Sequence, residues 1–367
     1  MQRGRPTVSD EVYRKLAKRL DEIPNGYAPT ESGVELRLLE RLFTREEAAL
    51  ATLMKLSPEP PAAIAERAGI DEPGAARMLH EMREKGLIRA ARGQEGPAYF
   101  LMPFVVGIYE AQLLHMDEEM AQLVERYFVE SRGGSMADGG SPVHRVIPVN
   151  ESVPQDLEIF PYESASEMLD HAMAWGVRNC ICRVQQNLIG KGCEHTVENC
   201  LVFAPVEGVF NDSEDIRVIT KEEAHRILAR AADEGLVHSA MNQQDQVHYI
   251  CNCCTCSCGI LRGVAEFGVP TAVARSAFRV AIDADRCTGC GACIRRCQFG
   301  ALSKDGDVSV ADYARCVGCG VCVSACPVEA IAMERRPEGE VDAPPENFKD
   351  WMVKKAEERG ISLDDIR

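Results

Sequence analysis

The stretch Asp283–Met333 decides the fold of its part of the chain. It reads DADRCTGCGACIRRCQFGALSKDGDVSVADYARCVGCGVCVSACPVEAIAM and holds eight of the seventeen cysteines. The spacing C-x2-C-x2-C-x3-C occurs twice, at Cys287, Cys290, Cys293 and Cys297, then at Cys316, Cys319, Cys322 and Cys326. Three thiolates two residues apart can wrap one tight loop around a cubane iron–sulfur cluster, while the fourth thiolate arrives from elsewhere. The doubled run predicts two [4Fe-4S] clusters.

Glycines lie between these cysteines, where the backbone must approach sulfur and needs positive φ; they are Gly289, Gly291, Gly318 and Gly320. Zinc ribbons space their cysteine pairs differently, and disulfide frameworks belong to small secreted domains. The segment resembles the bacterial-type two-cluster ferredoxin domain. In that domain the fourth cysteine of each run binds the other cluster. The resemblance implies one ligand set of Cys287, Cys290, Cys293 and Cys326, and a second of Cys316, Cys319, Cys322 and Cys297.

One residue departs from the ferredoxin pattern. Gln298 replaces the proline that usually follows the last cysteine, whereas Pro327 completes the second run. Because Cys297 is retained, the change bears on loop rigidity more than on cluster occupancy. Between the runs, residues 301–302 and 308–310 predict two short strands around a turn at Lys304–Asp307.

Length and charge set further bounds. A chain of 367 residues predicts about two or three domains. A net charge of −16 disfavours tight non-specific binding to nucleic acid. Seventeen cysteines without a signal peptide or a long apolar run predict a reducing cytoplasm and no membrane insertion. The ferredoxin-like segment also indicates an anaerobic or low-oxygen setting.

The N-terminal region, residues 1–130, shows a pattern of helices followed by a hairpin. A capping box at Thr44 opens one helix, a short helix follows at 62–68, and Asp71 can cap a third helix over Glu72–Lys85. Strands at 87–89 and 99–101 flank a glycine-rich turn at 92–96. Over residues 36–105 this order resembles a winged helix-turn-helix.

A winged helix often binds DNA through its third helix, which lies in a major groove. The basic residues of Glu72–Lys85 are balanced by three glutamates; the six residues are Arg77, Arg83, Lys85, Glu72, Glu81 and Glu84. This is a poor electrostatic footprint for DNA, so we favour protein contact or dimerisation over DNA binding. A further helix is predicted from Gly107 to Phe128, and residues 131–142 have the composition of a flexible linker.

The middle region, residues 143–280, contains the other nine cysteines in two groups. We expect an α/β region with strands at 143–149, 157–160 and 201–203 and helices at 162–175 and 220–234. The cysteines are Cys180, Cys182, Cys193 and Cys200, then Cys251, Cys253, Cys254, Cys256 and Cys258. Five cysteines within eight residues are hard to explain as packing. In a reducing compartment, soft thiolates point to at least one additional iron–sulfur cluster or to zinc.

The ligand assignment of this region stays open. Nine thiolates can form two four-cysteine sites with one left over, or one site together with redox-active thiols. The adjacent Cys253 and Cys254 cannot readily face one metal, so we expect a centre built from both groups. Arg183 either lies beside that centre as an anion or substrate partner, or is a surface arginine. Each histidine of the region is, by itself, weak evidence for a metal ligand. These histidines are His195, His238 and His248.

Residues 337–367 form the tail. The proline-rich, acidic stretch 337–345 predicts a linker. A helix is expected over Asn347–Arg359, with Phe348, Trp351 and Met352 on a face that docks on the body or on a second copy of the chain in a homodimer.

The whole arrangement resembles a family of bacterial and archaeal proteins. These join a winged-helix-like region, a Cys-rich middle with CxCR and CNCC motifs, and a C-terminal 4Fe-4S domain, here residues 281–336. The predicted fold class is α+β. The resemblance implies electron transfer. The function that we favour is a relay of electrons through the two ferredoxin clusters, between a redox partner protein and a centre in the middle region.

Two rival functions remain. One is a redox-sensing winged-helix transcriptional regulator. The other is an iron–sulfur reductase, an oxidoreductase whose substrate binds at the middle centre beside Arg183. The sequence has no glycine-rich dinucleotide motif after a strand and no Walker loop, so no flavin, nicotinamide or nucleotide site is predicted.

Overall fold

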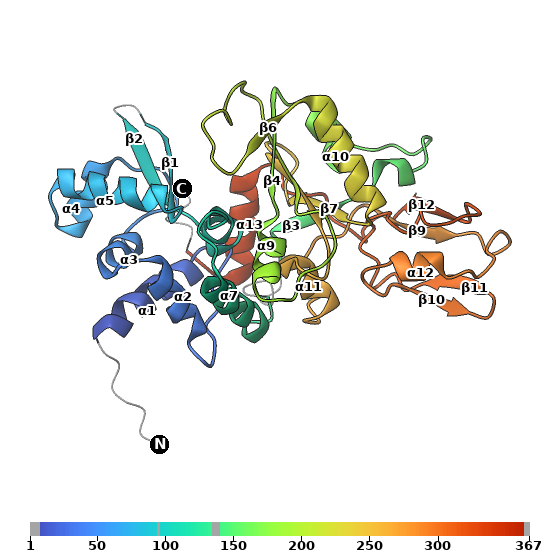
Figure 1. The fold of residues 1–367 in the computed structure, drawn as a ribbon, viewed down its shortest axis with the longest axis horizontal. Coiled ribbons are helices and arrows are strands. Elements are labelled where there is room, and N and C mark those ends of the chain that lie inside the picture. The colour runs from blue at the N-terminus through green and yellow to red at the C-terminus, as the bar shows by residue number, and fades with distance from the viewer. Residues whose placement is uncertain (1–7, 94–95, 134–139, 363–367) are drawn as a thin grey trace, which may run out of the picture. The chain divides into compact units, whose positions relative to one another are not determined.

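Two units make up the chain in this computed structural model, which describes residues 8–93, 96–133 and 140–362 (Figure 1). The first unit comprises residues 1–140 with 352–367, and the second comprises residues 141–351. Helices and mostly antiparallel strands are mixed along the chain, so the predicted α+β class is confirmed. Among the helices of the described ranges, none has the length and apolar character needed to cross a bilayer.

Helices build most of the first unit. The capping box predicted at Thr44 is present: its hydroxyl accepts from the Glu47 N–H, and the Glu47 carboxylate accepts from the Thr44 N–H. Asp71 caps a later helix by accepting from the Gly74 N–H. The helices up to this point are α1 (Val8–Asp21), α2 (Val34–Leu42), α3 (Arg45–Thr52), α4 (Pro61–Ala68) and α5 (Glu72–Glu84).

A two-stranded hairpin follows α5. Strands β1 (Ile88–Arg92) and β2 (Pro97–Leu101) pair antiparallel. Glu59, just before α4, adds a bridge to Tyr99 of β2. The helices and the hairpin therefore occur in the expected order, although residues 94–95 of the turn lie outside the described ranges.

The predicted continuous helix from Gly107 to Phe128 is wrong. The chain instead forms an irregular turn η1 (Phe104–Ile108), one short turn α6 (Tyr109–Ala111) and a new helix α7 (Glu118–Glu130). Asp117 starts that new helix, because its carboxylate accepts from the Met120 N–H. Of the linker expected at 131–142, residues 134–139 lie outside the described part of the chain.

An antiparallel sheet organises the second unit. The strand order is β3-β7-β8-β5-β4-β6. The strands are β3 (His144–Ile147), β4 (Ala174–Asn179), β5 (Glu198–Ala204), β6 (Arg217–Ile219), β7 (Val237–Met241) and β8 (Tyr249–Cys253). Every ladder of this sheet is antiparallel. The middle region is therefore of the α+β type, which corrects our α/β expectation, since antiparallel neighbours need no crossover helix.

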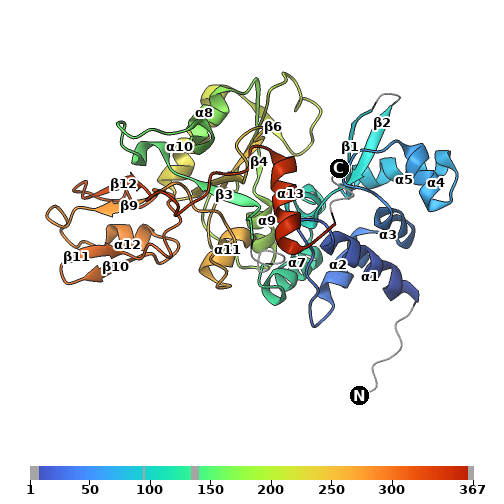
Figure 2. The same cartoon turned by 180° about the vertical axis from the view of Figure 1, so that it is seen from behind.

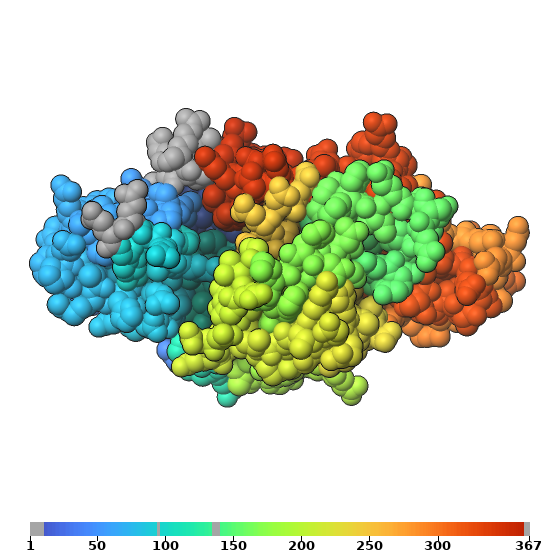
Figure 3. Space-filling model, turned by 90° about the horizontal axis from the view of Figure 1, so that it is seen from above, coloured from blue at the N-terminus to red at the C-terminus, as the bar shows by residue number. Residues whose placement is uncertain are grey.

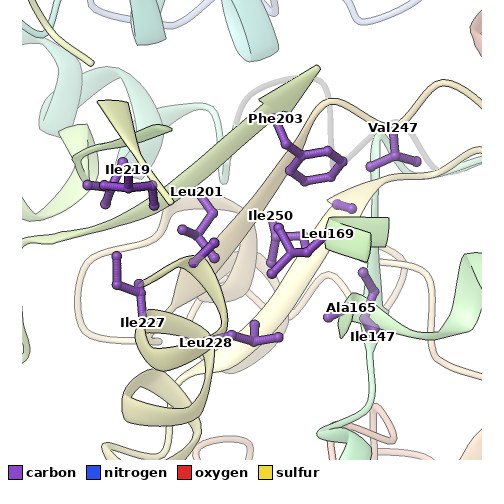
Figure 4. Close-up of a cluster of buried hydrophobic side chains, with 13 residues drawn as sticks. Ile147, Ala165, Leu169, Leu201, Phe203, Ile219, Ile227, Leu228, Val247 and Ile250 are labelled. Carbon is purple, nitrogen blue, oxygen red and sulfur yellow. The ribbon is translucent and has the colours of Figure 1, made fainter. Parts of the chain in front are cut away.

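One face of this sheet packs against α8 (Ala165–Asp170) and α10 (Lys221–Asp233). Leu201 and Ile250 lie in a cluster of buried side chains with Ile227 of α10 (Figure 4). Thr220 caps α10 by accepting from the Glu223 N–H. Because side chains alternate across a strand, the neighbours of Leu201 and Ile250 point to the opposite face of the sheet.

Two predicted elements of the middle region are wrong. Residues 157–160 form no strand, and the helix expected over 162–175 is only the turn η4 (Pro161–Glu163) and the short α8. Trp175 belongs to β4, where it pairs with Phe203 on one side and Ile219 on the other. Strand pairing with residues far along the chain therefore outweighs the local helical pattern.

The C-terminal part of the second unit contains short elements around the eight cysteines of the doubled run. Helix α12 lies between two small sheets, β9/β12 and β10/β11, in both ribbon views (Figure 1 and Figure 2). The hairpin expected between the cysteine runs is β10 with β11 and is confirmed. The remaining elements of this unit are η3 (Asn150–Ser152), α9 (Ile181–Leu188), α11 (Gly259–Ala265), β9 (Phe278–Ile282), α12 (Ala292–Arg296), β10 (Leu302–Asp305), β11 (Val308–Ala311) and β12 (Ile331–Arg335).

The middle region and the C-terminal segment pack against each other within this unit. The space-filling view shows green and yellow residues of the former adjoining orange and red residues of the latter (Figure 3). The Val149 N–H donates to the Cys319 carbonyl at 3.0 Å. The buried Arg336 guanidinium donates to the Cys316 carbonyl at 2.6 Å. Backbone carbonyls of the second cysteine run thus accept hydrogen bonds from residues outside its own loop.

The predicted C-terminal helix is present as α13 (Phe348–Arg359). Trp351 is 1% exposed and stacks on Phe348 with ring centroids 5.6 Å apart. Its indole N–H donates to the Pro142 carbonyl at 2.9 Å. The aromatic face of the helix therefore docks on the body of the chain, one of the two positions expected for it.

We expect Leu201→Ala to lower the free energy of unfolding of the second unit by about 2–5 kcal/mol, because the side chain is fully buried in the core beneath α10. Leu188→Ala is the matched control, since Leu188 is 39% exposed and its loss should change stability by about 0.5 kcal/mol or less. Both tryptophans of the chain, Trp175 and Trp351, lie in the second unit. Denaturation followed by tryptophan fluorescence measures this unit, and equal losses for both variants would contradict the core assignment.

Candidate metal centres

The two cysteine runs of the C-terminal segment differ in exposure. In the first run Cys290 is exposed, Cys287 is partly buried and Cys293 is buried. In the second run Cys316, Cys319 and Cys322 are all buried. One loop therefore faces solvent, and the other is enclosed by protein.

The glycines between these cysteines adopt the positive φ that the sequence predicted, with values from 62° to 77°. Gly318 shows why no side chain fits. A Cβ atom there would lie 2.1 Å from the Phe278 carbonyl oxygen and 2.2 Å from the Ser276 hydroxyl. Gly289 is similar, with the Asp307 carbonyl oxygen at 2.2 Å from such an atom. Both loops consequently follow a tight path that only glycine permits.

Backbone N–H groups point at three of the cysteine sulfurs. The Ala301 N–H donates to Cys297 Sγ at 3.3 Å, and the Ala330 N–H donates to Cys326 Sγ at 3.2 Å. These two bonds are equivalent, because each donor lies four residues after the fourth cysteine of its run. The Ser309 N–H donates to Cys287 Sγ at 3.4 Å and lowers the pKa of that thiol. Donors aimed at sulfur are what a cluster-bound thiolate needs.

In the second run, burial raises the pKa of the thiols, whereas the backbone donor lowers the pKa of Cys287. Burial raises the pKa of Cys319 to about 12 and that of Cys322 well above its usual value, and the nearby charges of Cys297 and Cys316 raise both further. Thiolates so close together and so buried need bound cations to remain deprotonated. The same interactions place Cys297 of the first run beside the cysteines of the second. The residues of the segment thus fit iron–sulfur clusters.

The nine cysteines of the middle region gather in two separate clusters. The first, the Cys3His cluster, has its ligand atoms within 4.8 Å of one another and consists of Cys193, His195, Cys254 and Cys256. Its Cys193 and Cys254 sulfurs are 3.8 Å apart. This cluster brings together both sequence groups.

The second, the six-cysteine cluster, consists of Cys180, Cys182, Cys200, Cys251, Cys253 and Cys258. Hydrogen bonds join Cys182 to Cys180 and Cys258, and others join Cys251 to Cys200 and Cys253. Cys200 and Cys251 alternate with core residues Leu201 and Ile250, so they point to the sheet face away from α10. Cys180 and Cys258 are the N-cap residues of α9 and α11.

Arg183 lies between the two clusters and is 1% exposed. It donates to the carbonyl of Asn252 at 2.9 Å, to the side chain of Asn199 at 2.8 Å and to Cys254 Sγ at 3.5 Å. Although burial opposes its charge, the neighbouring thiolates of Cys180, Cys254 and Cys253 raise its pKa. Arg183 is therefore a buried partner of thiolates, and the surface alternative is wrong.

Hydrogen bonds between thiols set which of them ionises first. Donation from Cys251 and Cys258 lowers the pKa of Cys253 to about 6. Donation from Cys256, together with the charge of Arg183, lowers the pKa of Cys254 to about 4. Each cluster therefore contains one thiol whose pKa is lowered by its neighbours, which favours its thiolate form.

Gln298, the residue that departs from the ferredoxin pattern, connects the two cysteine-rich regions. Its side-chain oxygen accepts from the Thr255 N–H at 2.7 Å, and its side-chain nitrogen donates to the Gly235 carbonyl. Arg296 donates to the carbonyls of Ala232 and Asp233 at the end of α10. A proline at position 298 has neither group, so the glutamine exchanges loop rigidity for a link between the regions.

The histidines have different surroundings. His238 is buried, and its Nδ1 lies 2.6 Å from the Asn252 side-chain oxygen, so it has a structural role. His195 is part of the Cys3His cluster, and its Nδ1 is 3.8 Å from the Glu234 carboxylate. Sequence reasoning gave His195 no more weight than the others, although its position two residues after Cys193 is a usable signal.

Residues 280–333 match the family model of the 4Fe-4S dicluster domain. This segment is an iron–sulfur domain. It supports electron transfer in general, and it covers the stretch from which the sequence predicted two clusters. A search among curated proteins found none that matches the chain.

We expect Gly318→Ala to reduce the iron content of the purified chain, because the added methyl group meets backbone oxygen in a loop with φ of 77°. Gly306→Ala is the matched control: its φ is also positive, 58°, but an added Cβ has nothing within 4 Å. Iron per chain and visible absorbance after anaerobic reconstitution report the effect. Unchanged iron in Gly318→Ala would show that the loop does not need this close approach.

Proposed function

We propose that the chain is an electron-transfer protein that carries electrons between a redox partner protein and a thiolate-bound centre in its own middle region. The observation that carries this proposal is the placement, in one unit, of the dicluster segment against a second region with nine cysteines. When bound, [4Fe-4S] clusters supply one-electron transfer at potentials that their surroundings set. The seventeen cysteines all lie in the described residues and none of them forms a disulfide there, which fits a reducing cytoplasm.

The ligand sets that we propose are crossed between the two runs. Cys287, Cys290, Cys293 and Cys326 hold one cluster, and Cys316, Cys319, Cys322 and Cys297 hold the other. The electrostatic interaction of Cys297 with Cys316, Cys319 and Cys322 supports this assignment. So does the matching N–H donation to Cys297 and Cys326.

The difference in exposure between the two cysteine loops suggests which loop contacts the redox partner and which contacts the middle region. The loop around Cys290 is exposed. The exposed Arg295 guanidinium donates to the Cys290 carbonyl, with 3.3 Å between donor and acceptor. We propose this loop as the docking surface for the redox partner, with Arg295 and Arg286 favouring an acidic patch on that partner. The buried loop around Cys319 faces the middle region: the Val149 N–H donates to the Cys319 carbonyl, and Arg336 donates both to the Cys316 carbonyl and to the Ser276 carbonyl of the middle region.

The six-cysteine cluster is the proposed receiving centre, with an iron–sulfur cluster as its occupant. Two helices begin there, so their N-terminal N–H groups favour the negative charge of thiolates. Arg183 adds a permanent positive charge. Its Nε and the Asn199 side-chain nitrogen are buried and have no hydrogen-bond partner among the described residues, so donors are left over in this region for a bound group.

The reductase alternative has less support. It requires Arg183 to bind substrate, but both terminal nitrogens of this guanidinium already donate to protein groups. A substrate anion would have to replace those buried bonds, which is unfavourable. Electron transfer to a bound centre requires no such rearrangement.

The regulator alternative depends on the winged-helix-like region, which we propose serves protein contact with a partner or with a second copy of the chain. Of the three basic residues on the helix predicted over Glu72–Lys85, two are already paired with glutamates. Arg83 lies 3.0 Å from Glu84, and Lys85 lies 2.6 Å from Glu47. Charges held in this way are poorly available for DNA phosphates.

Crossed ligation predicts unequal losses of iron in two double variants. Cys297→Ser with Cys319→Ser removes two ligands of the same cluster, so about four irons should be lost and one cluster should remain. Cys326→Ser with Cys319→Ser removes one ligand from each cluster, so both should be impaired. Iron analysis and electron paramagnetic resonance of the reduced chain measure this. The reverse order of losses would establish uncrossed ligation and contradict the assignment.

We further expect the full chain to bind mixed-sequence duplex DNA no more tightly than about 1 μM at physiological salt. Fluorescence anisotropy with a labelled duplex is the measurement. As a comparison, Glu47→Gln with Glu84→Gln frees Lys85 and Arg83 and should tighten binding modestly through added phosphate contacts. Nanomolar, sequence-specific binding by the unaltered chain would instead favour the regulator.

A further inference from the structure

We propose that the Cys3His cluster is a mononuclear site for a divalent cation of the zinc class, distinct from the six-cysteine cluster. The inference deepens the proposed function, on which it rests for the presence of a neighbouring iron–sulfur centre. It divides the nine middle cysteines between a structural cation and a redox centre. It also assigns the previously undistinguished His195 as a metal ligand.

The spacing of the sulfurs in the Cys3His cluster fits a single bound metal ion. Two thiolates bound to one tetrahedral zinc at 2.3 Å lie about 3.8 Å apart. Cys193 Sγ and Cys254 Sγ are 3.8 Å apart, and all four ligand atoms lie within 4.8 Å of one another. A cubane holds its thiolates on separate iron corners and therefore further apart. The Cys3His cluster has the size of a single-ion site.

Charge balance also fits a zinc-class cation. Three thiolates around a divalent ion leave one net negative charge, which is costly to bury alone. The Arg183 guanidinium supplies the compensating charge and lies 3.5 Å from Cys254 Sγ. The Ser257 hydroxyl lies 3.6 Å from Cys193 Sγ and can donate to it. The site is therefore provided with both a counter-charge and a hydrogen-bond donor.

A carboxylate lies near the His195 ring, at a distance longer than a hydrogen bond. A metal-binding histidine usually has a carboxylate, a backbone carbonyl or water at its other ring nitrogen, which fixes the ring orientation. The Glu234 carboxylate is 3.8 Å from His195 Nδ1. Glu234 is itself fixed, because it accepts hydrogen bonds from the backbone and hydroxyl of Thr196. The ring is thus set next to a carboxylate that cannot easily turn away.

The position of the site indicates a structural role. Four protein ligands leave no open position, which is typical of structural zinc. Thr255, between two of the ligands, donates its N–H to Gln298, and Gln298 follows Cys297 directly. A cation here fixes the 254–256 turn, and that turn holds the end of the first cysteine run. The site therefore joins the middle region to the iron–sulfur domain.

The test uses the full chain, purified anaerobically, treated with a chelator of divalent ions and reloaded with Zn²⁺ or Co²⁺ alone. The variants are Cys256→Ser and His195→Asn, chosen because Cys256 is exposed and His195 is partly exposed, so that folding is preserved. The controls are Cys200→Ser in the six-cysteine cluster and His171→Asn at an exposed histidine. Metal analysis, Co²⁺ absorption spectra and circular dichroism are recorded for each.

We expect about one tightly bound Zn²⁺ per unaltered chain, and sulfur-to-cobalt charge-transfer bands with tetrahedral Co²⁺. Cys256→Ser and His195→Asn should lose at least tenfold in cation affinity while iron content and circular dichroism stay unchanged, and both controls should keep the cation. No stoichiometric Zn²⁺ or Co²⁺ in the unaltered chain, or loss of iron in His195→Asn, would overturn the proposal. Failure of the electron-transfer function looks different: the cation is retained, but the iron–sulfur clusters are absent or cannot be reduced.

Discussion

The buried guanidinium of Arg183 is the interaction on which the cysteine-rich region depends. It hydrogen-bonds residues from two segments that are far apart in the sequence: Thr196 and Asn199 around the start of β5, and Asn252 and Cys254 around the end of β8. An arginine cannot lose its charge by deprotonation at any accessible pH, so the region must keep anionic partners around it. Thiolates are the partners that the chain supplies. The charge of Arg183 therefore connects the pairing of β5 and β8 with the ionisation of the nearby thiols.

The alternation of side chains along β8 then distributes those thiols. Cys251 and Cys253 share a face of the strand because they are two residues apart. The Asn252 side chain points to the other face, where its oxygen lies 2.6 Å from His238 Nδ1. Cys254, just beyond the strand, contacts Arg183 and Cys193 instead of the six-cysteine cluster. Adjacent cysteines therefore serve different clusters, as the steric argument from the sequence predicted. Which cysteines join them depends on the pairing of β5 with β8, which no local pattern reveals.

Sequence reasoning succeeded where a signal is local and has a fixed spacing. The caps at Thr44 and Asp71 each depend on two or three neighbouring residues, and both are present. It failed where pairing between distant segments decides the outcome. Trp175 continued an apparent helical pattern, but β5 and β6 on either side draw its backbone into the sheet. His195 was undervalued for the same reason, because Cys254 and Cys256 approach it only in the folded chain.

Gln298 shows how a departure from a motif acquires a meaning once the fold is known. From the sequence, the missing proline indicated only a less rigid loop. In the structure, its amide satisfies a donor at Thr255 and an acceptor at Gly235, both in the middle region. Arg296 adds its charge to the C-terminal carbonyls of α10, where a cation is favoured by the helix dipole. The first cysteine run therefore contributes two side chains that position the middle region and one thiol for the second cluster. Because position 298 also binds the middle region, it carries a glutamine where the ferredoxin pattern has proline.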